Sequence, residues 1–133
     1  MINKHKELGI EYFACTDHAS LTGALKAYIY AEKVGIKPIL GMEIYFKDNN
    51  CDIVRDTESA NIKYFKLILH AKDQEAYQKL VKKISTVKSK IFIQDKEYPS
   101  FDWNDLEELS KYNFTVATSD VECMVSKHLL IGR

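Results

Sequence analysis

Apolar positions along this chain follow two spacings, one typical of strands and one typical of helices. Short apolar runs rich in strand-forming residues predict strands at residues 12–16, 37–46, 64–70 and 114–118. Apolar residues three and four positions apart predict helices at residues 20–34, 73–87 and 103–111, and another helix begins at 125–130. The polar stretch 48–61 predicts a loop or hairpin tip, and Pro99 marks residues 91–100 as irregular.

Residue types that stop or start helices define the predicted boundaries. Ser20, Asp73 and Asp102 each stand where a helix should begin, and their side chains suit the N-cap position. Gly35 follows the first of these helices and suits its C-terminal cap. The apolar residues of that helix predict one buried face, made of Leu21, Ala24, Leu25, Tyr28 and Ile29.

The predicted order of elements favours an α/β fold. A strand, a helix and a second strand follow one another over residues 12–46, which predicts two parallel strands joined by a right-handed crossover. Further strands alternate with helices, so a mainly parallel sheet or part of a barrel is expected. An open part-barrel would expose strand edges and an apolar face, which predicts a second copy of the chain or another partner.

Composition fits one globular domain over residues 1–133. Apolar residues make up 46% of the chain, and 19 basic residues balance 19 acidic ones. A formal net charge of zero argues against binding nucleic acid by overall charge but not against a local basic patch. Three widely spaced cysteines suit a reducing compartment, and no apolar run has membrane-spanning length. The cytoplasm is the expected location.

The strongest candidate site lies where predicted strands end in polar residues. The first strand runs into Asp17 and His18, and Glu43 interrupts the apolar strand 37–46. Carboxylates and imidazoles at the carboxyl ends of strands are a common way to build a site on an α/β scaffold. An Asp-His pair is also frequent by chance, and His18 could merely cap a helix or satisfy a backbone carbonyl.

Several stretches resemble one family in their order and spacing. They are Thr16-Asp17-His18, residues 21–28, Gly35-Ile36-Lys37-Pro38-Ile39-Leu40-Gly41-Met42-Glu43, and Leu69-His70-Ala71-Lys72-Asp73 with residues 77–81. Together they are similar to the polymerase-and-histidinol-phosphatase (PHP) domain of the bacterial replicative DNA polymerase III alpha subunit. The resemblance implies a partial, distorted (β/α)7 barrel that spans the chain as a single partial PHP-like domain.

The resemblance also implies a metal centre. Complete members of the family hold three metal ions, usually zinc or manganese, and both metals accept imidazole and carboxylate ligands. His18 and Glu43 match two ligand positions of the family, and Asp17 beside them would orient an imidazole or cap the helix that follows.

Other ligand positions of the family are not matched. The family opens with a His-x-His strand that precedes the matching region. Lys66 stands where the family has a histidine, and Val121 stands where it has a cysteine, with Cys123 two residues later. Two ligands do not hold a catalytic cluster, so the expectation is no cofactor. We hypothesise that an ion pair between Lys66 and Glu43 replaces the metal bonds.

A row of lysines on the helix 73–87 and just beyond it has two interpretations. It is either a solvated helix face or a surface that contacts DNA or a replication partner, and it consists of Lys79, Lys82, Lys83 and Lys88.

Two functions are therefore expected. The first is a metal-degenerate PHP portion of a bacterial or phage DNA polymerase III alpha subunit, which braces the polymerase or binds replication partners and is not itself catalytic. The alternative is a PHP phosphoesterase, either histidinol-phosphatase-like or a 3′–5′ exonuclease, in which a metal-activated hydroxide attacks phosphorus. A chain that merely folds, without either activity, is the third reading.

Overall fold

The computed structural model describes residues 2–47 and 64–119. The described helices are α1 (Ile2–Glu7), α2 (Ala24–Val34), α3 (Gln74–Thr86) and α4 (Trp103–Ser110). The described strands are β1 (Tyr12–His18), β2 (Lys37–Phe46), β3 (Phe65–Ala71), β4 (Lys90–Ile93), β5 (Lys96–Phe101) and β6 (Phe114–Thr118). The predicted loop 48–61 and the predicted helix 125–130 lie outside the described residues.

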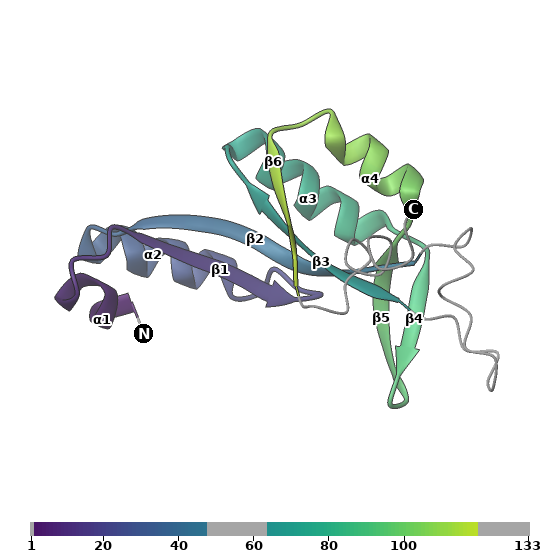
Figure 1. Cartoon of the computed structure of the whole chain (residues 1–133), viewed down its shortest axis with the longest axis horizontal. Helices are drawn as coiled ribbons and strands as arrows, with labels where there is room; N and C mark the ends of the chain where they lie inside the picture. The colour runs from purple at the N-terminus through teal and green to yellow at the C-terminus, as the bar shows by residue number, and fades with distance from the viewer. Residues whose placement is uncertain (1, 48–63, 120–133) are drawn as a thin grey trace, which may run out of the picture.

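The strands form one mixed six-stranded sheet (Figure 1). Its order is β4-β5-β2-β3-β6, and β1 pairs with the first part of β2. The pairs β1–β2 and β2–β5 are parallel, which confirms the predicted strand–helix–strand unit. The pairs β2–β3, β3–β6 and β4–β5 are antiparallel.

The expectation of a mainly parallel part-barrel was wrong, because most described pairings are antiparallel and the described sheet does not close. The reason is visible between β2 and β3. Two consecutive parallel strands need a crossover connection, usually a helix, whereas two consecutive antiparallel strands can be joined by a loop alone. Residues 48–61 have no apolar residues at helical spacing, so the sequence predicts no crossover helix between these two strands.

Residues 91–100 were predicted to be irregular and instead form most of a hairpin, which projects away from the helices (Figure 1). Gln94 and Asp95 have φ values of 48° and 62°, the left-handed conformation that tight hairpin turns require. Pro99 is tolerated because β5 pairs with β2 only from Ser100 onward, so at Pro99 it faces β4 alone.

Helix α2 starts four residues later than predicted. Ser20 does not cap it, because the Ser20 hydroxyl accepts a hydrogen bond from the Thr22 amide at 3.1 Å and the N-cap is Gly23. The predicted buried face of this helix was right for Ala24 but wrong for Leu25 and Ile29. Small residues of α2 face the protein, with Ala24 and Ala31 almost fully buried, while Leu25 and Ile29 are 65% and 58% exposed.

The caps of the other two helices were predicted correctly. The Asp73 carboxylate accepts a hydrogen bond from the Ala76 amide at 2.8 Å, and Asp102 forms a reciprocal capping box with Asp105. Both helices pack on one face of the sheet, over a core of Met42, Ile44, Phe46, Phe65, Leu67, Leu69, Leu80, Phe101 and Leu109. Trp103, the first residue of α4, is 47% exposed and meets the Phe46 ring edge-on.

Strand alternation sends the neighbours of these core residues to the opposite face. Met42, Ile44 and Phe46 point toward the helices, so Glu43 and Tyr45 lie on the other side of β2. The candidate site therefore lies on the sheet face that α3 and α4 do not cover.

Candidate functional site

His18 and Glu43 are direct neighbours across two parallel strands. The register pairs His18, the last residue of β1, with Glu43 in β2. The backbone continues the pairing one residue further, because the Ala19 amide donates to the Glu43 carbonyl at 2.8 Å. Residues 25 positions apart in the sequence are thus brought together by the crossover through α2.

A hydrogen-bonded network surrounds this pair. The His18 Nδ1 is bonded to the Glu43 carboxylate, and its Nε2 is bonded to the Tyr45 hydroxyl. The Ser119 hydroxyl donates to the second carboxylate oxygen of Glu43. We refer to His18, Glu43, Tyr45 and Ser119 as the Glu43 network.

Sequence reasoning missed Tyr45 and Ser119. Tyr45 could have been found, since it lies two residues after Glu43 on a strand and therefore shares its face. Ser119 had no such signal. It lies one residue beyond β6, a strand that pairs with β3 and not with β2, so its contact depends on how the chain leaves the sheet.

Aromatic rings pack around the imidazole. The Tyr45 ring meets the His18 ring edge-on, with centroids 4.7 Å apart, and the Tyr98 ring lies 5.9 Å from His18. Tyr64 packs edge-on against Tyr45 at 4.9 Å. These contacts leave the His18 side chain 41% exposed and the Glu43 side chain 18% exposed.

Electrostatics favour an ionised Glu43. Burial raises the pKa of this carboxyl, but hydrogen bonds from Ser119 and His18 and the charge of Lys66 outweigh that cost, and the net pKa falls below its ordinary value. Burial, together with Tyr64, Tyr98 and Glu43, raises the pKa of Tyr45 to about 12, so its hydroxyl stays protonated at neutral pH.

Lys66 lies in β3 opposite Tyr45 in the antiparallel register. It contributes its positive charge to the surroundings of Glu43, while the direct contacts to that carboxylate come from His18 and Ser119. That Lys66 stands in for the metal stays a prediction.

Asp17 faces α2. Its carboxylate accepts a hydrogen bond from the Gly23 amide at 2.8 Å, and the Cys15 thiol lies 3.9 Å from its other oxygen. Of the two predicted roles, these contacts correspond to holding the start of the helix. The backbone of Gly23 lies very close to the Asp17 side chain, because a Cβ on Gly23 would lie 2.3 Å from a carboxylate oxygen of Asp17.

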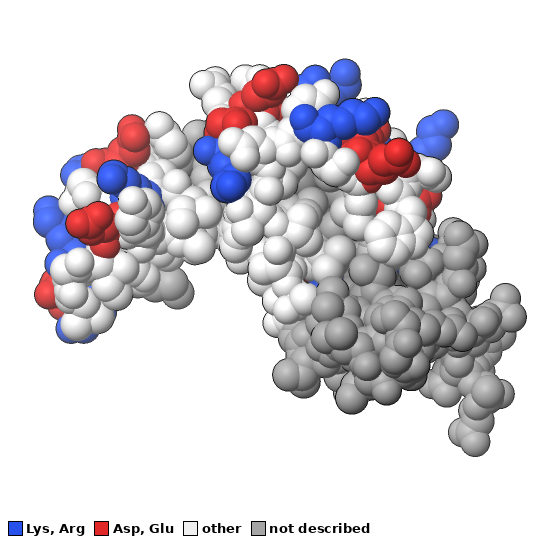
Figure 2. All heavy atoms as spheres, turned by 45° about the horizontal axis from the view of Figure 1, so that its top comes forward, with Lys and Arg blue, Asp and Glu red and all other residues white. Residues whose placement is uncertain are grey.

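Two of the four candidate lysines have partners within the domain. The Lys83 ammonium lies 2.7 Å from Asp105 and 2.5 Å from Glu108, and the Lys79 ammonium lies 4.8 Å above the centre of the Tyr112 ring. Lys82 and Lys88 are exposed. Figure 2 shows basic and acidic side chains interspersed over the described surface in that view.

The described residues do not fit the family's metal centre. They contain no group of three or more His, Cys, Asp or Glu side chains that could hold a metal ion. Both nitrogens of His18 and both carboxylate oxygens of Glu43 already have protein partners. A catalytic zinc usually needs three protein ligands, and the described residues bring together two.

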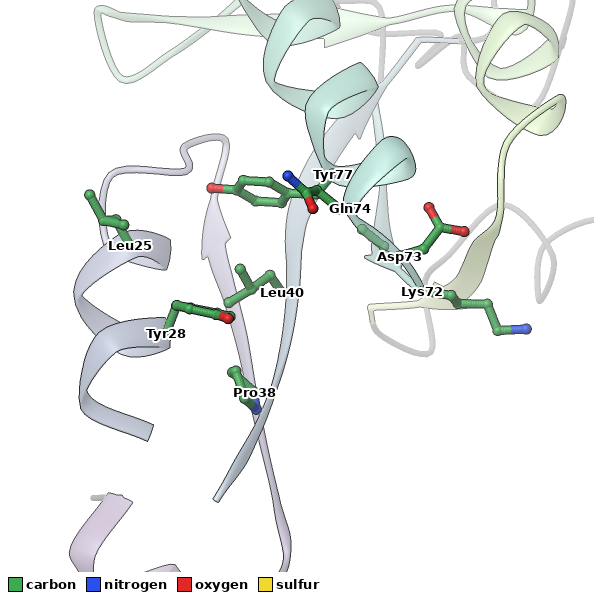
Figure 3. A pocket seen from close by; sticks show the side chains of 9 residues that line it. Leu25, Tyr28, Pro38, Leu40, Lys72, Asp73, Gln74 and Tyr77 are labelled. Carbon is green, nitrogen blue, oxygen red and sulfur yellow. The ribbon is translucent and has the colours of Figure 1, made fainter. Parts of the chain in front are cut away.

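An apolar groove of about 460 Å³ lies elsewhere, between α2 and α3. Its walls include Leu25, Tyr28, Leu40 and Tyr77, while the Lys72 side chain points away from α2 (Figure 3). Leu40 and Glu43 occupy opposite faces of β2 by alternation, so the groove is separate from the Glu43 network.

Comparisons with known proteins identify the class of this domain. The PHP domain family matches residues 1–133, and the chain belongs to that family. DNA polymerase III subunit alpha of Borreliella burgdorferi is 35% identical over 112 residues, which cover 84% of this chain and 9% of that protein. The corresponding Helicobacter pylori (strain ATCC 700392 / 26695) subunit is 40% identical over 76 residues, covering 57% of this chain and 6% of that protein.

A third relative is DNA polymerase III subunit alpha of Aquifex aeolicus, 40% identical over 86 residues, or 62% of this chain and 7% of that protein. The chain thus spans less than a tenth of the length of these relatives. Among the described residues, no helix has the length and apolar character needed to cross a membrane.

Proposed function

We propose that this chain is the PHP portion of a bacterial or phage DNA polymerase III alpha subunit and acts as a bracing and partner-binding module rather than as an enzyme. The similarity to polymerase alpha subunits supports the replication context. Its working partners are then the remainder of the polymerase, other replisome subunits or DNA, and its location is the cytoplasm.

The observation that carries the non-catalytic role is the state of His18 and Glu43. These two matching ligand positions are hydrogen-bonded to each other, and their remaining polar atoms are bonded to Tyr45 and Ser119. A metal ion would have to break these bonds before it could bind. Lys66 adds a positive charge beside Glu43, which opposes a cation at the same place.

A metal-dependent phosphoesterase is the second candidate, because β1 and β2 do bring an imidazole and a carboxylate together. Metal analysis separates the two functions. We expect the protein, purified without chelators, to carry no stoichiometric zinc or manganese, and to hydrolyse neither p-nitrophenyl phosphate nor 3′-labelled single-stranded DNA. Two or more bound transition-metal ions per chain, with hydrolysis lost in Glu43→Gln, would establish the phosphoesterase instead.

The bracing role needs its own test. We expect the chain to bind a polymerase alpha subunit from which the PHP region has been deleted, with co-elution in size-exclusion chromatography. A serum albumin, which should not co-elute with the chain, serves as the control for non-specific association. Failure to co-elute at micromolar concentrations would contradict the bracing role while leaving the family assignment intact.

A further inference from the structure

We propose that the Glu43 network is a metal-independent junction that fastens the ends of β1 and β6 to β2. The inference deepens the function proposed above at the same site. It concerns what the described side chains do in place of binding metal.

The first step is that Glu43 lies between the ends of two strands, β1 and β6. His18 is the last residue of β1, and Ser119 follows the last residue of β6. Each of them bonds a different carboxylate oxygen of Glu43. One side chain in the middle of β2 therefore connects two segments that are about a hundred residues apart in the sequence.

The second step is that backbone pairing joins β1 to β2 but does not join β6 to β2. β6 pairs with β3, and β3 lies between β6 and β2 in the sheet. Ser119 follows the end of β6, and its hydrogen bond to Glu43 links this segment to β2 across β3.

The third step is that the polar atoms of His18 and Glu43 all have partners within the protein. Tyr45 supplies a hydroxyl to the second imidazole nitrogen, and Lys66 supplies positive charge near the carboxylate. A half-buried carboxylate with hydrogen bonds to both oxygens and a nearby cation is stable without metal. This is the composition of a structural network rather than of an open ligand site.

Hydrogen exchange measured by mass spectrometry tests the junction directly. We expect Ser119→Ala to speed amide exchange in β6 about tenfold, the size of effect that losing a hydrogen bond to a charged group produces, with no change in α3. Tyr45→Phe should speed exchange at the end of β1. His70→Ala is the matched control, because His70 lies in the same sheet outside the network, and it should leave the end of β1 unchanged.

The metal arm of the experiment repeats these measurements with EDTA and with added zinc or manganese. We expect the same exchange rates in every case. Metal-dependent protection of β1 that Glu43→Gln abolishes would overturn the junction, and so would unchanged exchange in both Ser119→Ala and Tyr45→Phe. Metal that binds the wild type without altering exchange in β1 or β6 would contradict the proposed function but support the junction.

Discussion

The two faces of the sheet are stabilised in different ways. The face under α3 and α4 carries an apolar core in which Phe46, Leu80 and Phe101 are fully buried. The other face carries Glu43, Tyr45 and Lys66, whose interactions are hydrogen bonds, ring contacts and charge. Burial of apolar area is roughly additive and indifferent to pH, whereas a polar network depends on each partner and on protonation.

The largest effect is expected on the apolar face. Phe46→Ala should lower the free energy of unfolding by about 3–5 kcal/mol, because it removes a fully buried ring that packs against Trp103 and leaves a cavity. Urea denaturation followed by circular dichroism measures the loss. Tyr98→Ala, a half-buried ring on the other face, is the matched control and should cost less. An equal cost at both positions would remove the distinction between the faces.

The next effect concerns pH and belongs to the polar face. The pKa of Glu43 is lower in the folded protein than in the unfolded chain, so its ionisation stabilises the fold above the unfolded value of 4.5. That contribution should disappear as the pH falls through the lowered folded pKa. Thermal melts from pH 7 to pH 2 should show a steeper loss of stability in the wild type than in Glu43→Gln. Parallel curves would contradict the lowered pKa.

A smaller effect is expected where the two helices meet. Lys83→Met should cost about 1 kcal/mol, because Asp105 loses its cation while only 16% of its side chain is exposed to water. Lys88→Met changes an exposed lysine of the same row and should lie within about 0.5 kcal/mol of the wild type. Denaturant midpoints of the two variants give the comparison, and equal midpoints would show that the ion pairs contribute nothing.

The smallest effect on stability should come from the exposed side of α2. Leu25→Glu should change unfolding by less than about 0.5 kcal/mol, because Leu25 is largely in water. It should nevertheless reduce self-association, since Leu25 and Ile29 form an exposed apolar surface beside the groove. Sedimentation velocity at rising concentration measures this. A wild type that stays monomeric throughout would remove the expectation of an oligomer.

Local signals in the sequence predicted local structure well. The caps at Asp73 and Asp102 and the parallel pairing of β1 with β2 all follow from short-range patterns, and the structure has them. The His18–Glu43 contact follows from that pairing as well, because the register of the two parallel strands places the last residue of β1 beside Glu43.

What the sequence did not reveal has two causes, which are contacts between segments that are distant in the sequence and one tight turn that lacks its usual residues. Apolar spacing placed Leu25 and Ile29 on the buried side of α2, but the helix packs through Ala24 and Ala31, whose small side chains permit a closer approach to the sheet. The hairpin of β4 and β5 was not predicted because its turn residues, Gln94 and Asp95, are not the glycine-containing pair typical of such a turn. Ser119 was unpredictable because its partner is two strands away.

The close approach of Asp17 to Gly23 has a consequence for variation in this loop. Any side chain at position 23 would collide with the carboxylate, which would have to swing aside and give up its bond to the amide at the helix start. A larger residue at position 23 therefore costs this hydrogen bond unless position 17 changes as well. The two positions are expected to change as a pair, and laboratory selection for folded variants should recover them jointly.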